Sequence, residues 1–374
     1  MRQYLLPLAA LLAATPALPQ ASANIAAGRA QPSPLAPAEI VNAAKGDWAA
    51  IASSDLLVMD LAPDAKGKPR RVVIQLMPAP FSQGWVGNIR KLAAAKFWDG
   101  TSINRVQDNY VVQWGDATEK KPLPAGLAVV PQSEYVAEIR EELIDDPIVH
   151  GHRVRPWATN VSGEGGVFTP IAVPPMSKRR SKASADQAQY RRETYGWPTG
   201  FAEGWPVSGD LNARGRLGKT GEIWPVHCYG MVGVGRDLPP NTGTGAELYT
   251  VIGHAPRHLD RNIALVGRVI EGMEHLSSLP RGKGELGFYA KDEAARRTPI
   301  LTVRVASDLP EASASSSEAV GQQTRPAFEY LSTESDTFAA YAEAIVNRRD
   351  PFFIAPAGGA DICNIKVPVR RVAS

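Results

Sequence analysis

Residues 97–116, FWDGTSINRVQDNYVVQWGD, contain a single arginine between two runs of strand-forming residues. Asp99-Gly100 and Asp108-Asn109 supply residue types that tight turns need, and the β-branched and aromatic residues around Arg105 favour strands. A guanidinium fixed on a strand presents N–H donors, which act strongly on a group that gains electron density when water is excluded. Taken alone, Arg105 is more typical of an ordinary surface arginine on a strand. The neighbouring sequence must therefore decide whether it has a catalytic role.

Three elements before this arginine must help to position it. Residues 56–61 and 71–76 have the composition of strands and flank a turn, which predicts a hairpin. Residues 82–95 repeat apolar side chains at the spacing of one helix face, and Ser82 is the predicted N-cap.

A second block of strand-like sequence follows after a long gap. It reads VHCYGMVGVGR at 226–236, PNTGTGAELY at 240–249, HLD at 258–260, ALVGRVIEGM at 264–273 and ILTVRV at 300–305. In order and spacing the two blocks resemble the cyclophilins, the barrel-type peptidyl-prolyl isomerases. The matching family sequences read GFYDGTxFHRV, xFMIQGGD, GxVxMAR, PNTNGSQFF, WLD and VVFGKVxEGM. Each motif alone is weak, but a chance match of both blocks is improbable.

This resemblance implies a mainly β fold, an eight-stranded antiparallel barrel capped by two helices, within residues 55–307. The family crosses the interval between the blocks in far fewer residues, so residues 117–222 are predicted to be an insertion that packs beside the barrel. Within it, residues 136–143 have the pattern of a strand or a short helix. Residues 308–374 are predicted to be a linker and a C-terminal extension, with a helix at 336–347.

The resemblance also implies the reaction, which is cis–trans isomerisation of prolyl bonds in polypeptide substrates, with no cofactor and no metal. Twisting a prolyl amide requires groups that favour the twisted state, in which the nitrogen becomes pyramidal and gains a lone pair. Arg105 aligns with the family's catalytic arginine. Gln113 aligns with the glutamine that holds the substrate backbone and helps to orient the arginine.

Eight further positions align with residues that bind substrate in the family. The resemblance implies an apolar cup for the pyrrolidine ring, formed by Tyr110, Val111, Tyr249, Leu259 and Ile263. It implies contacts with the substrate backbone from Gly235, Arg236 and Glu247. All five cup residues are equally typical of the core of a barrel.

Some positions depart from the family pattern. Two histidines and a tryptophan of the family are replaced by Asn104, Ile263 and His258. Tyr110 and Tyr249 replace phenylalanines and add hydroxyls that need partners, while Glu247 replaces a glutamine, and a carboxylate cannot donate a hydrogen bond. These departures motivate an alternative function, a non-catalytic peptide-binding or chaperone module that uses the insertion as its contact surface.

The N-terminus has the pattern of an export signal. Arg2 precedes a short apolar run at 5–14, and Ala21-Ser22-Ala23 forms a cleavage signature. We therefore expect a signal peptide at 1–23, a leader at 24–54 and a periplasmic protein. The net charge of +3 comes from scattered residues, which argues against nucleic acid or an anionic membrane as the main partner.

The sequence contains two cysteines, Cys228 and Cys363. In an oxidising compartment they would pair and tie the C-terminal segment to the core, but two free buried thiols are nearly as plausible. His150-Gly151-His152 has chelating side chains, but its isolation favours a polar loop over a metal site.

Overall fold

The structure is a computed structural model that describes residues 35–139, 148–149, 152–156, 199–210, 221–311, 324–355 and 360–372. The predicted signal peptide and the dipeptide at 150–151 lie outside these residues. From Leu35 onward the chain forms one compact unit. None of the helices in the described ranges has the length and apolar character needed to cross a membrane.

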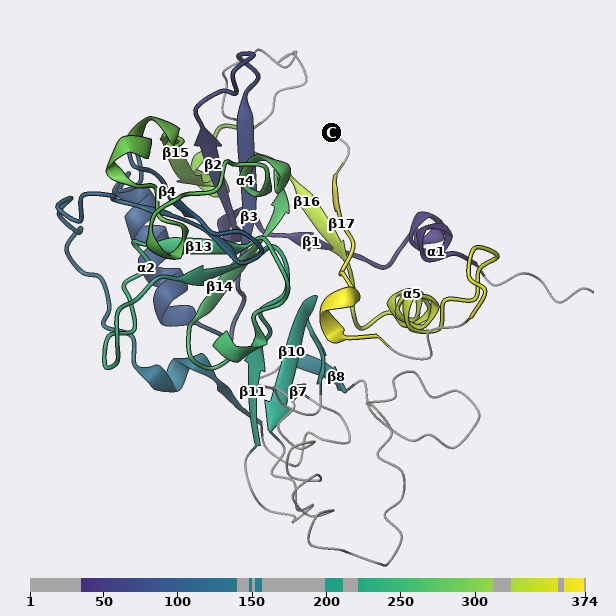
Figure 1. The fold of residues 1–374 in the computed structure, drawn as a ribbon. Coiled ribbons are helices and arrows are strands. Elements are labelled where there is room, and N and C mark those ends of the chain that lie inside the picture. Colours follow the sequence, from purple (N-terminus) through teal and green to yellow (C-terminus); the bar gives the residue numbers. More distant parts are fainter. Residues whose placement is uncertain are drawn as a thin grey trace, which may run out of the picture. The chain divides into compact units, whose positions relative to one another are not determined.

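An antiparallel sheet of eight strands forms the barrel (Figure 1). In chain order the strands are β2 (Leu56–Leu61), β3 (Arg70–Leu76), β4 (Ser102–Val106), β5 (Val111–Gly115), β12 (Met231–Val234), β13 (Leu248–Val251), β14 (Leu265–Glu271) and β15 (Ile300–Val305). Their order in the sheet is β15-β2-β3-β14-β12-β13-β5-β4. The two edge strands meet, because Ile103 N donates to Thr298 O at 2.9 Å and Ile300 N donates to Thr101 O at 2.8 Å. The predicted barrel is confirmed.

Helix α2 (Gln83–Ala94) packs against the barrel through a buried apolar face that includes Trp85, Ile89 and Leu92. The predicted N-cap is wrong in its chemistry. Ser82 occupies the cap position in a left-handed conformation, with φ 55°, and its side chain makes no capping hydrogen bond. Glu134 supplies the acceptor instead, since its Oε2 accepts from Gly84 N at 2.8 Å. The second capping helix, α4 (Glu274–Ser277), is a single turn.

The insertion contains a sheet of its own, which its sequence did not predict. Its six strands, in sheet order, are β6 (Ala137–Ile139), β11 (Gly221–Pro225), β10 (Trp205–Asp210), β9 (Thr199–Ala202), β8 (His152–Pro156) and β7 (Ile148–Val149). The strand or helix expected near 136–143 is the strand β6, and the later residues of that range lie outside the described part.

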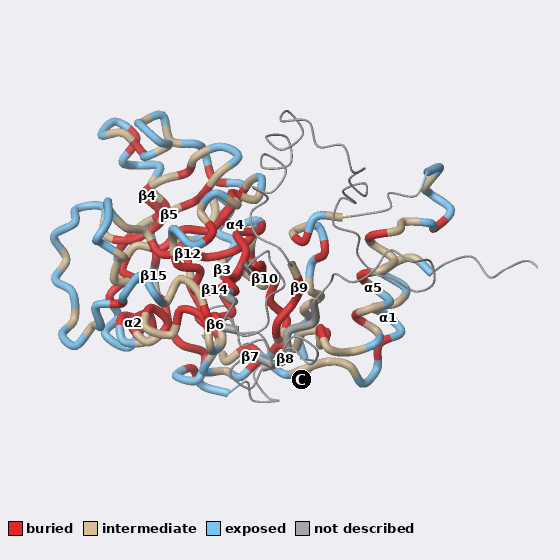
Figure 2. The backbone as a smooth tube through the Cα atoms, turned by 90° about the horizontal axis from the view of Figure 1, so that it is seen from below, coloured by how far each residue is buried: buried red, intermediate tan, exposed pale blue. Residues whose placement is uncertain are grey.

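Arg268 of β14 joins this second sheet to the barrel. Its guanidinium lies 4.5 Å from the centroid of the Trp205 ring and donates to Gly204 O at 2.6 Å and to Gln75 Oε1 at 2.9 Å. Burial lowers the pKa of Arg268 to about 10. Residues of both sheets belong to one continuous apolar core, and Figure 2 shows that buried residues extend from the barrel strands into β9 and β10.

Segments from the two ends of the described chain form a third sheet. Strand β1 (Trp48–Ile51) pairs with β16 (Phe328–Leu331), which pairs with β17 (Val369–Arg371). Helices α1 (Pro37–Ala43) and α5 (Asp336–Val346) contact each other, and Ser335 Oγ caps α5 by accepting from Phe338 N at 3.0 Å. Helix α5 agrees with the sequence prediction, but its pairing with α1 was not predicted.

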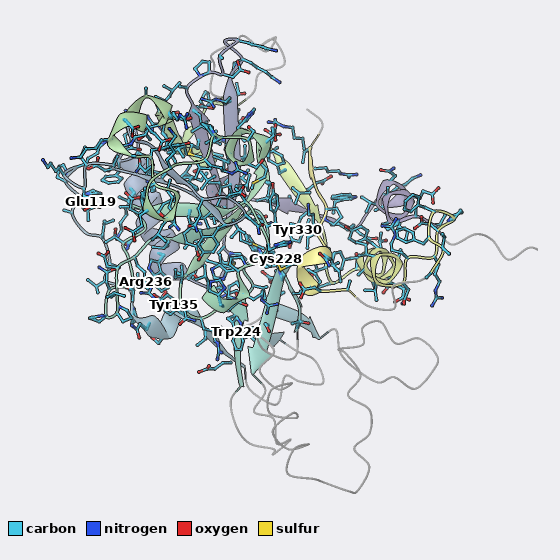
Figure 3. The ribbon with its side chains drawn as sticks, viewed as in Figure 1. Glu119, Tyr135, Trp224, Cys228, Arg236 and Tyr330 are labelled. Atoms are coloured by element: carbon cyan, nitrogen blue, oxygen red, sulfur yellow. A yellow bond between two sulfur atoms is a disulfide. The ribbon has the colours of Figure 1, made fainter. Side chains whose placement is uncertain are left out.

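Cys228, which Figure 3 labels near β10, forms a disulfide with Cys363 of the C-terminal extension. The bond spans 135 residues of sequence. Of the two alternatives left open by the sequence, the structure therefore has the paired form, and the extension is covalently tied to the segment before β12.

We expect the Cys228→Ser/Cys363→Ser variant to lose about 2–5 kcal/mol of unfolding free energy, because a closed loop restricts the unfolded chain. Thermal unfolding with and without reductant measures this loss. Reductant should destabilise the wild type and leave the double variant unchanged. Equal sensitivity of both proteins to reductant would contradict the assignment.

Candidate functional site

Four side-chain positions form one row across adjacent strands of the barrel. Gly233 of β12 lies opposite Tyr249 of β13, Tyr249 lies opposite Gln113 of β5, and Gln113 lies opposite Arg105 of β4. Residues directly opposite in neighbouring strands point to the same face of a sheet. Adjacent residues such as Val112 point into the main core, so the row lies on the outer face of the barrel.

Arg105 reaches this face because β4 contains a bulge. Ile103 pairs with Trp114 and Arg105 pairs with Gln113, so Asn104 is an extra residue between two consecutive pairs. If the strand were regular and Asn104 paired with Gln113, Arg105 would share the inward face of Ile103. Asn104 is buried, donates through Nδ2 to Gly115 O at 3.1 Å, and accepts from Ser102 Oγ at 2.8 Å.

The Arg105 guanidinium is half-buried and held on three sides. Nε donates to Leu286 O at 2.7 Å, Nη1 to Gln113 Oε1 at 3.2 Å, and Nη2 to Gln107 Oε1. Its carbon lies 5.7 Å from the centroid of the Tyr110 ring and 5.3 Å from that of Phe288. Burial lowers the pKa of Arg105, and the nearby Tyr110 opposes the shift. The result is a fixed cation among aromatic rings.

Four of the five predicted cup residues come together in an apolar cluster that is separate from the main core. Val111, Tyr249 and Val251 are its buried members, and Tyr110 and Ile263 pack against them. Leu259 ends the short helix η4 (Arg257–Leu259), and its carbonyl accepts from Ile263 N at 3.1 Å. The cluster is small and separate from the main core, and Tyr249 belongs both to it and to the row.

His258 forms the outer side of this cluster. Its ring stacks on Tyr110, with centroids 6.3 Å apart and an angle of 9° between the planes. Tyr110 therefore contacts both His258 and the Arg105 cation. At the position where the family has a tryptophan, this chain thus has a smaller aromatic ring that contacts Tyr110.

Glu247 and Gly235 lie at the other end of Gln113. A Cβ added to Gly235 would be 3.0 Å from Glu247 Cβ and 3.3 Å from Gln113 Nε2, and one added to Gly115 would collide with the Glu247 carboxyl group. The Gln113 amide thus has Arg105 at its oxygen and Glu247 near its nitrogen. A side chain at 115 or 235 would therefore require Glu247 to move.

The guanidinium of Arg236 is directed to the chain's own backbone. Nε and Nη2 donate to Asn262 O at 3.0 and 2.7 Å, and Nη1 donates to Asp237 O at 2.6 Å. Figure 3 shows Arg236 near Tyr135 of the insertion, consistent with their electrostatic interaction. Arg236 therefore stabilises the loop at Asn262, next to Ile263 of the cup wall.

Burial raises the pKa of Glu247 to about 8, against the opposing hydrogen bonds from Gln113 and the Asp116 backbone; the charges of Asp116 and Glu119 add to the increase. At neutral pH the group is a carboxylic acid, and its O–H can donate a hydrogen bond. The expected loss of a donor relative to glutamine therefore applies only above this pKa.

A known protein family matches the part of the chain that contains these residues. The model of the family described as cyclophilin type peptidyl-prolyl cis-trans isomerase/CLD matches residues 67–305. The chain belongs to this family of isomerases. The match includes Arg105, Gln113 and every predicted cup residue.

A solved structure has a similar fold. The crystal structure of the cyclophilin AquaCyp293 from Hirschia baltica is similar to this chain at a TM-score of 0.56 and 20% identity, over 87% of this chain and 94% of that one. Because this share exceeds the segment matched by the family model, the likeness in fold includes residues outside that segment.

A second solved structure is a cyclophilin type peptidyl-prolyl cis-trans isomerase of Cryptosporidium parvum in the presence of the dipeptide Ala-Pro. It covers 66% of this chain and 98% of that one at 9% identity, with a TM-score of 0.32, which is too low to support an argument. A search of curated proteins finds no match.

Sequence reasoning missed several residues of this cyclophilin's site. Gln107 could have been found, because it follows Arg105 by two positions on the same strand end. Phe288 contacts Arg105 from a loop far along the sequence, and nothing in its local sequence marks it. His227, which accompanies Tyr249, and Gly233 were also missed, since only the strand register brings them beside the cup.

Glu247→Gln tests the neutral acid. In the wild type, kcat/KM for prolyl isomerisation should fall as pH rises through about 8, because ionisation removes the donor. The glutamine variant keeps a donor and should show a flat profile. The raised pKa also means that the wild type loses stability relative to the variant as pH rises from the ordinary glutamate value to about 8. A pH profile shared by both proteins would contradict the assignment.

Proposed function

We propose that this cyclophilin catalyses prolyl isomerisation by electrostatic stabilisation of the twisted bond, with Arg105 as the donor and exported polypeptides as substrates. The observation that carries the proposal is the row in which Arg105, Gln113 and Tyr249 lie opposite one another on adjacent strands. A cation, a backbone-binding amide and an aromatic wall are thereby presented on one face.

Prolyl isomerisation requires mainly that the protein place hydrogen-bond donors correctly around the twisting bond. The partial double bond of the amide gives a barrier of about 18–20 kcal/mol, and twisting transfers electron density to the prolyl nitrogen. Arg105 has five N–H groups, and the three bonds described above use one each. Donors therefore remain for the prolyl nitrogen, and the Tyr110 and Phe288 rings reduce the water around them.

The neighbouring groups supply orientation and binding. Gln113 Oε1 accepts from Arg105 and so limits the rotation of the guanidinium. Tyr110 and Ile263, the partly buried members of the cluster, offer apolar area to a pyrrolidine ring, with Val111 and Tyr249 packed behind them. Gln113 and the neutral Glu247 offer donors to the peptide backbone. This combination suits proline-containing polypeptides, since it holds one ring and leaves the flanking chain free to turn.

Arg105→Ala should lower kcat/KM on an Ala-Pro peptide by about 10²–10³-fold, the usual effect of removing one electrostatic donor. NMR exchange spectroscopy of the cis and trans signals measures the rate. The matched control is Arg90→Ala, because Arg90 lies on α2 and is paired with Asp55. The control should keep the wild-type rate.

An unchanged rate in Arg105→Ala would refute the role of this residue. If the wild type itself gave no acceleration at high enzyme concentration, the non-catalytic peptide-binding or chaperone function would replace this proposal. That alternative predicts suppression of client aggregation that persists in Arg105→Ala.

Export to a periplasm is the second part of the proposal. It is supported by the apolar run and the cleavage signature at the N-terminus, and by a disulfide, since disulfides persist mainly in oxidising compartments. The substrates would then be proteins that fold outside the cytoplasm.

Expression of the full chain in a Gram-negative bacterium tests export. Intact mass spectrometry of the periplasmic fraction should give a protein that begins at Asn24, because cleavage is expected after Ala21-Ser22-Ala23. Recovery of the uncleaved chain from the cytoplasm would contradict the proposal.

A further inference from the structure

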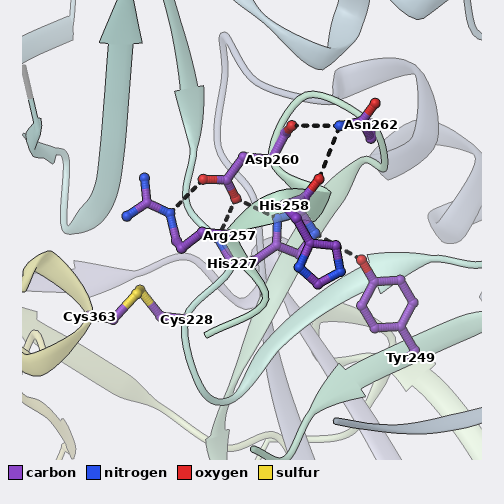
Figure 4. A network of polar contacts seen from close by, with 8 residues as sticks. All are labelled: His227, Cys228, Tyr249, Arg257, His258, Asp260, Asn262 and Cys363. Atoms are coloured by element: carbon purple, nitrogen blue, oxygen red, sulfur yellow. Dashed lines mark hydrogen bonds and ion pairs between the residues drawn. A yellow bond between two sulfur atoms is a disulfide. The ribbon is translucent and has the colours of Figure 1, made fainter. Parts of the chain in front are cut away.

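A chain of buried polar side chains runs behind Tyr249 (Figure 4). Tyr249 Oη lies 2.9 Å from His227 Nε2, His227 Nδ1 lies 2.8 Å from Asp260 Oδ1, and Arg257 Nε donates to Asp260 Oδ2 at 2.6 Å. His227, Tyr249 and Asp260 are exposed by only 1%, 4% and 5%. The Tyr249 hydroxyl, which was expected to need a partner, thus has one in His227, which lies away from the cup.

The hydrogen bonds in this chain have one consistent direction. Asp260, paired with Arg257, acts as an acceptor, and its Oδ1 also accepts from His227 N at 3.0 Å. His227 must therefore carry its proton on Nδ1. Burial lowers the pKa of His227 despite the opposing effect of Asp260, which leaves the ring neutral and Nε2 an acceptor. The Tyr249 hydroxyl consequently donates to Nε2.

This chain connects two parts of the cup that belong to different elements. Tyr249 on β13 is a buried member of the cup, while Asp260 directly follows Leu259 and precedes the turn to Ile263, which form its wall. His227 lies between them, in the segment before β12. Each end of the chain is thus fixed to a different side of the same apolar cluster.

Gly233 completes a slot for the phenol ring. It lies directly opposite Tyr249, and a Cβ at this position would collide with Cζ and Oη of the tyrosine. The His227 ring is nearly parallel to that of Tyr249, at 9° with centroids 6.4 Å apart. The ring is therefore held by a glycine beneath it and a histidine at its hydroxyl.

A carboxylate, a histidine and a hydroxyl in sequence could also form a catalytic triad. Burial raises the pKa of Tyr249 well above its ordinary value, and its hydroxyl is directed to the histidine and not to the cup. The arrangement therefore lacks an accessible nucleophile and suits positioning.

We propose that His227 is a positioning residue of the isomerase site, which fixes the distance between the Tyr249 ring and the Leu259–Ile263 wall through its two hydrogen bonds. This inference rests on the proposed function of the cup. The Arg105–Gln113 pair lies on β4 and β5 and has no member in the chain, so His227 governs the binding of the prolyl ring and leaves the twisting step largely unaffected.

Two variants remove the same hydrogen bond from opposite ends. Tyr249→Phe keeps the ring and loses the hydroxyl. His227→Asn keeps a donor for Asp260, but its shorter side chain does not reach Tyr249 Oη. Each should raise KM and the Kd for an Ala-Pro peptide about three- to tenfold, as expected for one buried hydrogen bond, with kcat within about twofold. The double variant should resemble the more impaired single variant.

The matched control is Tyr341→Phe, which removes a hydroxyl bonded to Lys366 O at 2.8 Å in the C-terminal extension. It should leave KM, kcat and Kd unchanged. Thermal unfolding of all variants verifies that they fold. A purely structural role for His227 would lower the unfolding temperature of the two site variants without changing KM or Kd, and that result would overturn the proposal. Additive effects in the double variant would overturn it too.

The histidine tautomer gives a readout that does not depend on activity. ¹⁵N NMR should show His227 protonated at Nδ1 in the wild type, and the Nε2 resonance should move in Tyr249→Phe. An Nε2-protonated ring in the wild type would refute the hydrogen-bond direction. The Kd arm also separates the two proposals, because Tyr249→Phe should weaken peptide binding even if Arg105 proves to have no catalytic role.

Discussion

A bulge in a single strand determines which side chains share the outer face of this cyclophilin's barrel. An unbroken β4 would direct Arg105 inward with Ile103 and place a guanidinium in the apolar core, where an unpaired charge is very costly. The bulge at Asn104 turns the next residue outward and opposite Gln113. The Asn104 amide secures the bulge through the Gly115 carbonyl. The rest of the row then follows from the register of β5, β13 and β12.

The ionisable groups of this site are all partly or fully buried, but they differ in their charge state. Desolvation disfavours the charged form of every ionisable group, yet the outcome depends on the partners. The three acceptors and two rings around Arg105 favour its cation, whereas Glu247 and His227 become neutral. A charged donor, a neutral acid and a neutral histidine thus coexist around one apolar cluster, and each has a distinct role in the proposed function.

The segments added to the barrel are connected to it by a few strong contacts. Arg268 fixes the insertion sheet through Gly204 and Trp205. The disulfide fixes the C-terminal extension to Cys228, the residue after His227. Both anchors lie on segments that also lead to the site, since β14 pairs with β12 and His227 contacts Tyr249. The additions therefore restrain the same part of the barrel that carries the cup.

The amino-acid sequence by itself determined the barrel strands, helices α2 and α5, and the residues proposed for the site. These elements have local signals: alternating β-branched residues, an apolar stripe at helical spacing, and short motifs whose order matches a family. It also favoured a prolyl isomerase, because Arg105, Gln113 and the aromatic positions occur within those motifs.

Only the tertiary structure decided how these residues act together. The bulge that exposes Arg105, the neutral state of Glu247 and the histidine behind Tyr249 depend on register and burial, which involve residues far apart in the chain. The same applies to the insertion sheet and to the sheet formed by the two ends, whose short strands have little periodicity and gain stability only by pairing with distant partners. Local patterns determine elements, whereas desolvation and cross-strand contacts exist only once the elements have packed.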